Sequence, residues 1–146
     1  MMPWRLFALA AVAAVLVSCS SAPKPETVHD LTPYARIQAI PPADPKKYRE
    51  VNDYRTWRNP YLIIKTDGVG LLDVSNNEEH WIKLEELPDR LAQLPSAAWP
   101  YGRVVAVSEN GVRAPGDDVL IRKNRGIVLG TLESMHVLVS IGPPAG

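Results

Sequence analysis

The sequence has few residues from which a reactive or metal-binding centre could be built. It contains one cysteine and three histidines among its 146 residues. One cysteine cannot form an internal disulfide, and His29, His80 and His136 do not show the spacing of metal ligands. The 16 basic residues are balanced by 16 acidic ones, which removes the electrostatic basis for nucleic-acid binding. We therefore expect no metal, no cofactor and no nucleic-acid partner.

The sequence also lacks an apolar stretch long enough to cross a membrane. Its most hydrophobic segment, residues 6–17, follows Arg5 and is shorter than the roughly 20 residues that a transmembrane helix needs. A positively charged start, a short apolar run and small residues before a cleavage site are typical of a secretory signal peptide. We therefore expect residues 1–18 to be a cleaved leader rather than a transmembrane anchor.

The only cysteine stands where this leader changes into polar, proline-rich sequence. The stretch Leu16-Val17-Ser18-Cys19 resembles the signal of bacterial lipoproteins, with Leu16 at −3, Val17 at −2 and Ser18 at −1. The resemblance implies cleavage before Cys19 and acylation of its thiol and its new amino group. Each buried lipid methylene contributes about 0.8 kcal/mol, so two or three acyl chains hold firmly. In the same family, Ser20 implies the outer membrane, with the protein facing the periplasm.

Two segments separate the cysteine from the first predicted strand. Residues 19–43 are rich in proline, serine and alanine without a sustained apolar period, so we expect a disordered or partly polyproline II tether. Residues 44–60 begin with Asp44 and Pro45, which predict the N-cap and first residue of a short helix. That helix has to end before Pro60, because proline disfavours helical geometry in the preceding residue.

The first half of the predicted domain is a hairpin followed by a helix. Residues 61–66 and 69–74 are rich in β-formers and flank Asp67-Gly68, a pattern typical of an antiparallel hairpin with a two-residue turn. After a polar loop at residues 75–80, leucines recur at spacings of three and four and predict an amphipathic helix. These leucines are Leu84, Leu87, Leu91 and Leu94.

The second half is a strand, a segment with two interpretations and a last strand. Residues 103–108 form an almost continuous apolar run, as in a central strand. Residues 118–134 form either a helix capped by Asp117 or Asp118, or a hairpin. The hairpin stays open because Gly126 and Gly130 each disfavour a helix by about 1 kcal/mol relative to alanine. Residues 136–141 predict the last strand. The helical interpretation places on one face Leu120, Ile127, Val128, Leu132 and Met135.

These elements follow the order β-β-α-β-α-β and predict a small two-layer α+β domain over residues 61–143, with a tail at residues 144–146. Both helices would cover one face of a mixed sheet. The other face would be left partly open, so we expect a second copy of the chain or a bound partner to cover it.

Residues 61–143 resemble the periplasmic domain of the biopolymer-transport proteins ExbD and TolR. The similarity lies in the element order, in the Asp67-Gly68 hairpin, in the Leu-Glu-Glu-Leu helix start at residues 84–87, and in the Val-Val-Ala-Val strand at residues 104–107. The resemblance implies a dimerising envelope domain that binds the cell wall or partner proteins. Those proteins also have a transmembrane helix with a proton-sensing aspartate. This chain has a cleavable leader instead, so energy coupling is not implied.

The sequence offers one candidate contact site and no convincing catalytic one. Trp99 and Tyr101 lie near Arg103, and these residue types are enriched in interface hot spots and can stack on sugars. Alternatively, these aromatic residues cover the rim of a small core. Asp117 and Asp118 could act as paired carboxylates, but an N-cap and an acidic first turn of a helix explain them fully, and we favour that interpretation.

We therefore expect a non-catalytic, lipid-anchored envelope protein that binds peptidoglycan or an envelope partner protein. The alternatives are an accessory subunit of a secretion or transport complex, which would require an obligate protein partner, and a small hydrolase that uses carboxylates.

Overall fold

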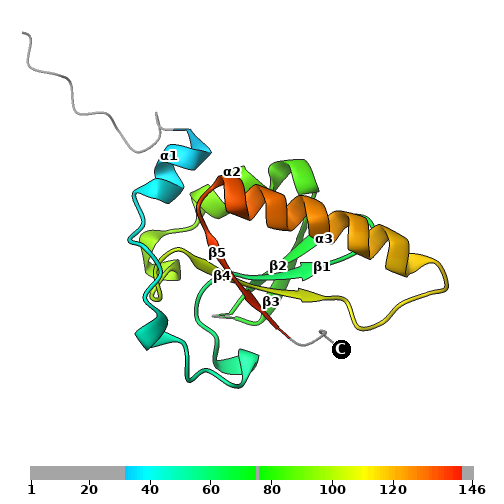
Figure 1. The fold of residues 1–146 in the computed structure, drawn as a ribbon, viewed down its shortest axis with the longest axis horizontal. Coiled ribbons are helices and arrows are strands. Elements are labelled where there is room, and N and C mark those ends of the chain that lie inside the picture. Colours follow the sequence, from blue (N-terminus) through cyan, green and yellow to red (C-terminus); the bar gives the residue numbers. More distant parts are fainter. Residues whose placement is uncertain (1–31, 75, 143–146) are drawn as a thin grey trace, which may run out of the picture.

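A mixed five-stranded sheet with helices on one face forms the centre of the structure, a computed structural model that describes residues 32–74 and 76–142 (Figure 1). The strand order is β3-β2-β1-β4-β5, and the predicted α+β class is confirmed. The strands are β1 (Tyr61–Ile64), β2 (Val69–Asp73), β3 (Glu78–Ile82), β4 (Val104–Glu109) and β5 (Leu138–Ile141). The α-helices are α1 (Pro33–Gln38), α2 (Leu87–Gln93) and α3 (Asp117–Ser134). Single 3-10 turns occur at Pro45–Lys47, Tyr54–Thr56, Leu84–Glu86 and Ser96–Ala98.

The predicted hairpin is present, but its turn lies one residue earlier than predicted. β1 pairs with β2 in antiparallel orientation and with β4 in parallel orientation. The backbone N–H of Lys65 donates to the carbonyl of Gly68 at 3.0 Å, so Gly68 closes the turn instead of forming its tip. A side chain here would collide with the backbone, because a Cβ on Gly68 would lie 2.6 Å from the carbonyl oxygen of Ile82. Glycine is therefore needed for close packing against β3.

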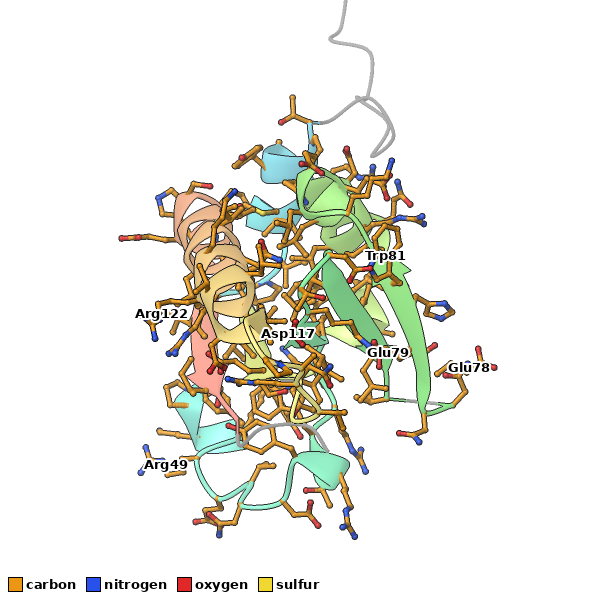
Figure 2. The ribbon with its side chains drawn as sticks, turned by 90° about the vertical axis from the view of Figure 1, so that its right-hand side faces the viewer. Arg49, Glu78, Glu79, Trp81, Asp117 and Arg122 are labelled. Atoms are coloured by element: carbon orange, nitrogen blue, oxygen red, sulfur yellow. The ribbon has the colours of Figure 1, made fainter. Side chains whose placement is uncertain are left out.

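β3 is a strand that the sequence analysis assigned in part to a polar loop. It pairs antiparallel with β2 at the edge of the sheet, and four of its five residues are exposed. Figure 2 shows Glu78 projecting outward from this strand. An exposed edge strand has no buried face that would impose alternation on its sequence, which explains why the pattern was not recognised. The observed order is β-β-β-α-β-α-β, with α1 in front.

α2 carries the predicted leucine stripe. Leu87 and Leu91 are fully buried, while Leu84 and Leu94 are half-buried against the same hydrophobic core. Pro88 lies in the first turn of the helix, where its missing N–H has no intrahelical partner to lose. The leucine stripe therefore packs against one face of the sheet, as predicted.

Residues 118–134 belong to a helix, but its buried face differs from the predicted one. Val128 and Leu132 are buried as predicted, whereas Leu120 and Ile127 are 47% and 42% exposed. Asn124 takes a core position instead, because its side-chain amide donates to the carbonyls of Lys65 and Thr66 at 2.7 and 3.0 Å. A buried amide is tolerated where its hydrogen bonds are satisfied. Ile121 completes the buried face.

The start of α3 also differs from the prediction. Its N-cap is Gly116, which makes no side-chain hydrogen bond, so neither Asp117 nor Asp118 is the cap. Instead, the Asp117 carboxylate accepts from the backbone N–H of Ala114 at 2.6 Å. Both aspartates lie in the first helical turn, where negative charge interacts favourably with the helix dipole.

The second face of the sheet, predicted to be partly open, is covered in part by the chain itself, while Trp81 on β3 stays 48% exposed on this face. Residues 43–58, here called the arm, run across it on the side opposite to α2 and α3 (Figure 1). Asp44 caps its first turn as predicted, with its carboxylate accepting from the N–H of Lys46 at 3.1 Å. No longer helix forms, because Asp53 caps a new turn in the same way and such local side-chain bonds compete with helix formation.

The buried cluster under the arm is largely aromatic. The ring centroid of Trp57 lies 5.7 Å from that of Tyr48, 5.8 Å from that of Tyr54 and 5.1 Å from that of Tyr101. Such separations are typical of attractive aromatic pairs. Tyr54 also contacts the ring of Tyr61 on β1, at 5.6 Å. The arm therefore forms a second core, distinct from the aliphatic one under the helices.

The predicted tether is shorter than residues 19–43, because its last part is folded. In α1, Ile37 is fully buried in the helix-side core. The amide of Gln38 donates to the carbonyl of Met135 at 2.6 Å, which joins α1 to the end of α3. Pro41 then accepts a backbone hydrogen bond from Arg103 at 2.9 Å. A six-residue helix with a single buried side chain leaves too little periodicity to be recognised in a proline-rich sequence.

Candidate functional site

The predicted lipidation site lies outside the described residues. Leu16, Val17, Ser18 and Cys19 precede residue 32, where the description begins. The signal peptide and the acylated cysteine therefore stay predictions. In residues 32–74 and 76–142, no helix combines the length and the hydrophobicity that crossing a bilayer requires.

The predicted contact surface at Trp99 and Tyr101 is wrong, because both side chains are buried. Trp99 is 4% exposed and Tyr101 is 8% exposed. Trp99 belongs to the aliphatic core under the helices and Tyr101 to the aromatic core under the arm. The turn around Pro100 directs the two rings to opposite faces of the sheet, so they cannot form one surface. The alternative interpretation, in which these aromatic residues complete a small core, agrees with the structure.

Arg103 is half-buried, and its hydrogen bonds hold two segments of the fold together. Its guanidinium donates to the side-chain oxygen of Gln38 in α1, and its backbone N–H binds the carbonyl of Pro41. Its Nε is buried without a hydrogen-bond partner in the described part of the chain. Arg103 therefore connects the N-terminal helix to the sheet, and it is not available as an exposed partner contact.

Two adjoining hollows form a groove at the end of the sheet where β1 begins and β2 ends. The first has a volume of about 430 Å³ and the second of about 630 Å³. Arg58, Val74 and Ala97 line both hollows, so we treat them as one feature, here called the groove. The first hollow is lined by apolar side chains that include Pro60, Leu71, Leu72, Leu94 and Pro95. The second is lined by Arg55, Thr56, Trp57 and Pro100.

A buried asparagine fixes the wall between the arm and the sheet. The Asn59 amide donates to the carbonyls of Gly102 and Val104, both at 2.7 Å, and its side-chain oxygen accepts from the N–H of Tyr101 at 2.8 Å. Asn59 is fully buried, and buried polar groups hold their geometry where their hydrogen bonds are satisfied. The preceding residue, Arg58, is therefore held on a rigid segment.

The charges of the two hollows differ. Arg55 and Arg58 are exposed, and within the described ranges no ion pair joins either guanidinium to a carboxylate. No acidic residue lines the second hollow, whereas Asp73 lines the first. The groove therefore combines a mainly apolar hollow, which Asp73, His80 and Arg58 also line, with a hollow lined by Arg55 and Arg58 and by no carboxylate.

A second polar cluster lies where the parallel strands end, next to the start of α3. Arg113 contacts the carboxylate of Asp118 at 2.6 Å and that of Glu109, and Arg125 contacts Glu109 at 3.3 Å. The hydrogen bonds that Arg113 donates to Asp118 and then to Glu109 raise the pKa of its guanidinium. Every charge named here has a partner, so the cluster fastens the loop before α3. Asp118 in this cluster and Asp117 at the N–H of Ala114 are both engaged, which accounts for the aspartate pair without a catalytic role.

The described residues contain no group of three or more histidine, cysteine, aspartate or glutamate residues that could hold a metal ion. His80 lies on β3 and His136 lies just beyond α3, where its φ of 54° helps to end the helix. His29, the third histidine considered, precedes the described residues. The groove was missed by sequence analysis because its lining comes from segments that are far apart in the chain.

Comparisons of the chain with protein-family models, with curated proteins and with solved structures find no match. The resemblance to ExbD and TolR therefore stays a prediction.

Proposed function

We propose that this chain is a non-catalytic, lipid-anchored binding protein of the bacterial cell envelope. Acyl chains on Cys19 hold it at the outer membrane, and the domain that follows recognises an envelope partner protein or peptidoglycan from the periplasmic side. The groove is the surface that performs this recognition.

The leader supports the location. Leu16, Val17 and Ser18 precede the only cysteine of the chain, and a cysteine without a disulfide partner is a reactive liability in an oxidising compartment. Acylation removes that liability and supplies the anchor. Residues 20–31 separate Cys19 from the first described residue, which gives the domain reach from the membrane.

The observation that carries the binding role is the composition of the groove. Hollows of about 430 and 630 Å³ lie within the range of about 300–1,000 Å³ that is usual for ligand sites. Apolar walls with a small number of placed charges are typical of recognition sites. Arg55 and Arg58 supply those charges, and arginine is favoured wherever carboxylates or phosphates are recognised.

Mass spectrometry of the protein purified from its native membranes tests the anchor. We expect a chain that begins at Cys19 and carries the mass of two or three acyl chains. Cys19→Ala should abolish the acyl mass and shift the protein from the membrane fraction to the soluble one or leave the leader uncleaved. Ser21→Ala is the matched control and should change neither. An unmodified chain that retains its first methionine would refute the proposal.

Photo-crosslinking in cells tests the binding role. A photoreactive amino acid at position 97, on the groove, should yield an adduct with one partner protein or with peptidoglycan fragments. The control position is Val119, which is 71% exposed on α3 and does not line the groove. The same adducts from both positions would mean that the groove is not the recognition surface.

A second candidate function, an accessory subunit of a secretion or transport complex, is favoured by the edge at β5. Leu138 and Ile141 on this edge strand are 55% and 57% exposed, and exposed apolar edge strands tend to be covered by a neighbouring chain. Such a subunit would need its partner continuously. Leu138→Lys should then dissociate a stable complex in native gels, whereas a recognition protein that uses the groove would be unaffected.

A further inference from the structure

We propose that the occupant of the groove is the carboxyl-terminal end of a partner protein, bound as an extended peptide. Its terminal carboxylate lies between Arg55 and Arg58, and its preceding apolar side chains lie in the first hollow. This inference rests on the proposed function and names the class of partner that the groove recognises.

The carboxylate is assigned to the second hollow because of the charges there. Arg55 and Arg58 both line it, and no acidic residue does. The nearest acidic residue in sequence, Asp53, uses its carboxylate to accept from the backbone N–H of Arg55 at 2.9 Å, which leaves both guanidinium groups for a ligand. A guanidinium binds a carboxylate through two parallel hydrogen bonds, a geometry that an ammonium or an amide cannot reproduce.

The apolar part of the ligand is assigned to the first hollow. Leu71, Leu72 and Leu94 line it together with Pro60 and Pro95, so small aliphatic side chains can be removed from water there. The two ends of the groove therefore fix the direction of the bound peptide.

The absence of a stacking surface argues against a sugar as the occupant. Among the described residues, the only tryptophan, tyrosine or phenylalanine side chain that lines the groove is Trp57, which is 2% exposed because it packs among the tyrosines of the arm. Its indole N–H donates to the carbonyl of Pro60 at 3.2 Å. Trp57 therefore supports the wall of the groove and offers no open ring face, whereas sugar sites commonly rely on such a face.

The groove is also held in shape before a ligand arrives. The hydrogen bonds of Asn59 fix the segment next to Arg58, and the indole of Trp57 fixes the turn that carries both arginines. A site that needs little ordering on binding retains more of its interaction free energy as affinity. Short peptides should therefore bind without a folding transition of the protein.

Calorimetric titration of the purified, acylated protein in detergent provides the test. The probes are the peptide acetyl-Gly-Ala-Leu-Val-Ala with a free carboxylate, the same peptide with a carboxyl-terminal amide, and muropeptides released from purified peptidoglycan. We expect the free carboxylate to bind at least about tenfold more tightly than the amide, since a hydrogen-bonded charge contributes about 1.5–3 kcal/mol and 1.4 kcal/mol corresponds to a factor of ten.

Arginine variants locate the site. Arg58→Gln should weaken binding of the free carboxylate by about tenfold and leave binding of the amide unchanged. Arg58→Lys should recover only part of the loss. The matched control is Arg49→Gln. Arg49 lies on the arm but lines neither hollow, and it projects into solvent in Figure 2. Both arginines are exposed, so thermal midpoints should match the unsubstituted protein.

Three results would overturn the inference: equal affinity for the carboxylate and the amide, equal losses in Arg49→Gln and Arg58→Gln, or tighter binding of muropeptides than of the peptide. Each of them leaves the proposed function standing if Cys19 is acylated and the groove still yields crosslinks in cells. Conversely, an unmodified Cys19 refutes the envelope anchor even if the peptide binds as expected.

Discussion

The two faces of the sheet are covered in different ways. On one face, α2 and α3 bury an aliphatic core that includes Leu87, Leu91 and Leu132. On the other face, the arm buries an aromatic core around Trp57 and Tyr101 with only two single 3-10 turns. The difference shows that a covering layer does not need regular secondary structure if a few large rings supply the buried area.

The two coverings also differ in what holds them. The helices satisfy most of their backbone groups internally, and they are attached to the sheet by apolar packing and by the Asn124 amide. The arm has such internal bonds only in short turns and depends more on side chains, above all on the adjoining Asn59, which binds three backbone groups of residues 101–104. The function we propose uses the rim of the less regular face, as is common for loops held on a rigid scaffold.

The largest expected effect tests whether the arm face is a true core. Trp57→Ala should lower the free energy of unfolding by about 4 kcal/mol, because it removes a buried ring and leaves a cavity among three tyrosines. Urea denaturation measures this loss. Trp81→Ala is the control: Trp81 is 48% exposed, so we expect a loss below about 1 kcal/mol. Similar losses in the two variants would mean that the arm is only loosely attached.

The packing of the helix layer is tested at α3, where the buried face differs from the predicted one. Ile121→Ala should cost about 3 kcal/mol of stability, since Ile121 is 2% exposed. Leu120→Ala, at the neighbouring position, should lower the free energy of unfolding by no more than about 0.5 kcal/mol. Thermal or urea unfolding of the two variants shows which face of α3 is buried. A larger loss at position 120 would restore the predicted face.

A smaller effect is expected at the link between the arm and the sheet. Asn59→Ala should cost about 2 kcal/mol, because it leaves two carbonyls and one N–H without their buried partner. The control Asn52→Ala, at an exposed position of the arm, should change the free energy of unfolding by no more than about 0.5 kcal/mol. Hydrogen exchange of residues 101–104 should accelerate only in the first variant. Unchanged exchange would show that Asn59 does not hold the wall of the groove.

The smallest effect has the opposite sign and concerns the outer surface of the helix layer. Gly126→Ala should raise stability by about 1 kcal/mol, because alanine favours a helix interior over glycine and a Cβ at this position meets no atom within 4 Å. Gly130 has the same open surroundings and should behave alike. A loss of stability in either variant, measured by thermal unfolding, would indicate that another chain packs against these glycines.

How much of the fold the sequence predicts depends on local patterns. The hairpin follows β-formers on either side of Asp67-Gly68, the leucine stripe of α2 follows spacings of three and four residues, and β4 follows a continuous apolar run. All three elements are present. Leu120 and Ile127 misled the prediction for α3, because hydrophobicity does not reveal that Asn124 can satisfy its amide inside the core. β3 and the arm carry no period, and tertiary contacts alone determine their positions.

The candidate site could not be predicted in the same way. The groove draws Arg58, Leu72, Leu94 and Ala97 from separate segments, and no local pattern joins them. Trp99 and Tyr101 are equally suited to a core and to an interface, and only the structure distinguishes the two. One local signal was present, since Arg55 and Arg58 flank the buried Trp57 closely. Two arginines beside a ring that anchors the segment indicate charges held in a fixed position.

The contact between the arm and the last strand has a consequence for the order of assembly. The hydroxyl of Tyr54 lies 2.8 Å from the carbonyl of Ile141 and 3.0 Å from the Oγ of Ser140, 87 and 86 positions further along the chain. During synthesis, the arm cannot complete these bonds until β5 has emerged from the ribosome. Maturation of the aromatic side therefore waits for β5, and a chain that lacks this strand would expose Trp57 and its neighbouring rings to proteases and chaperones.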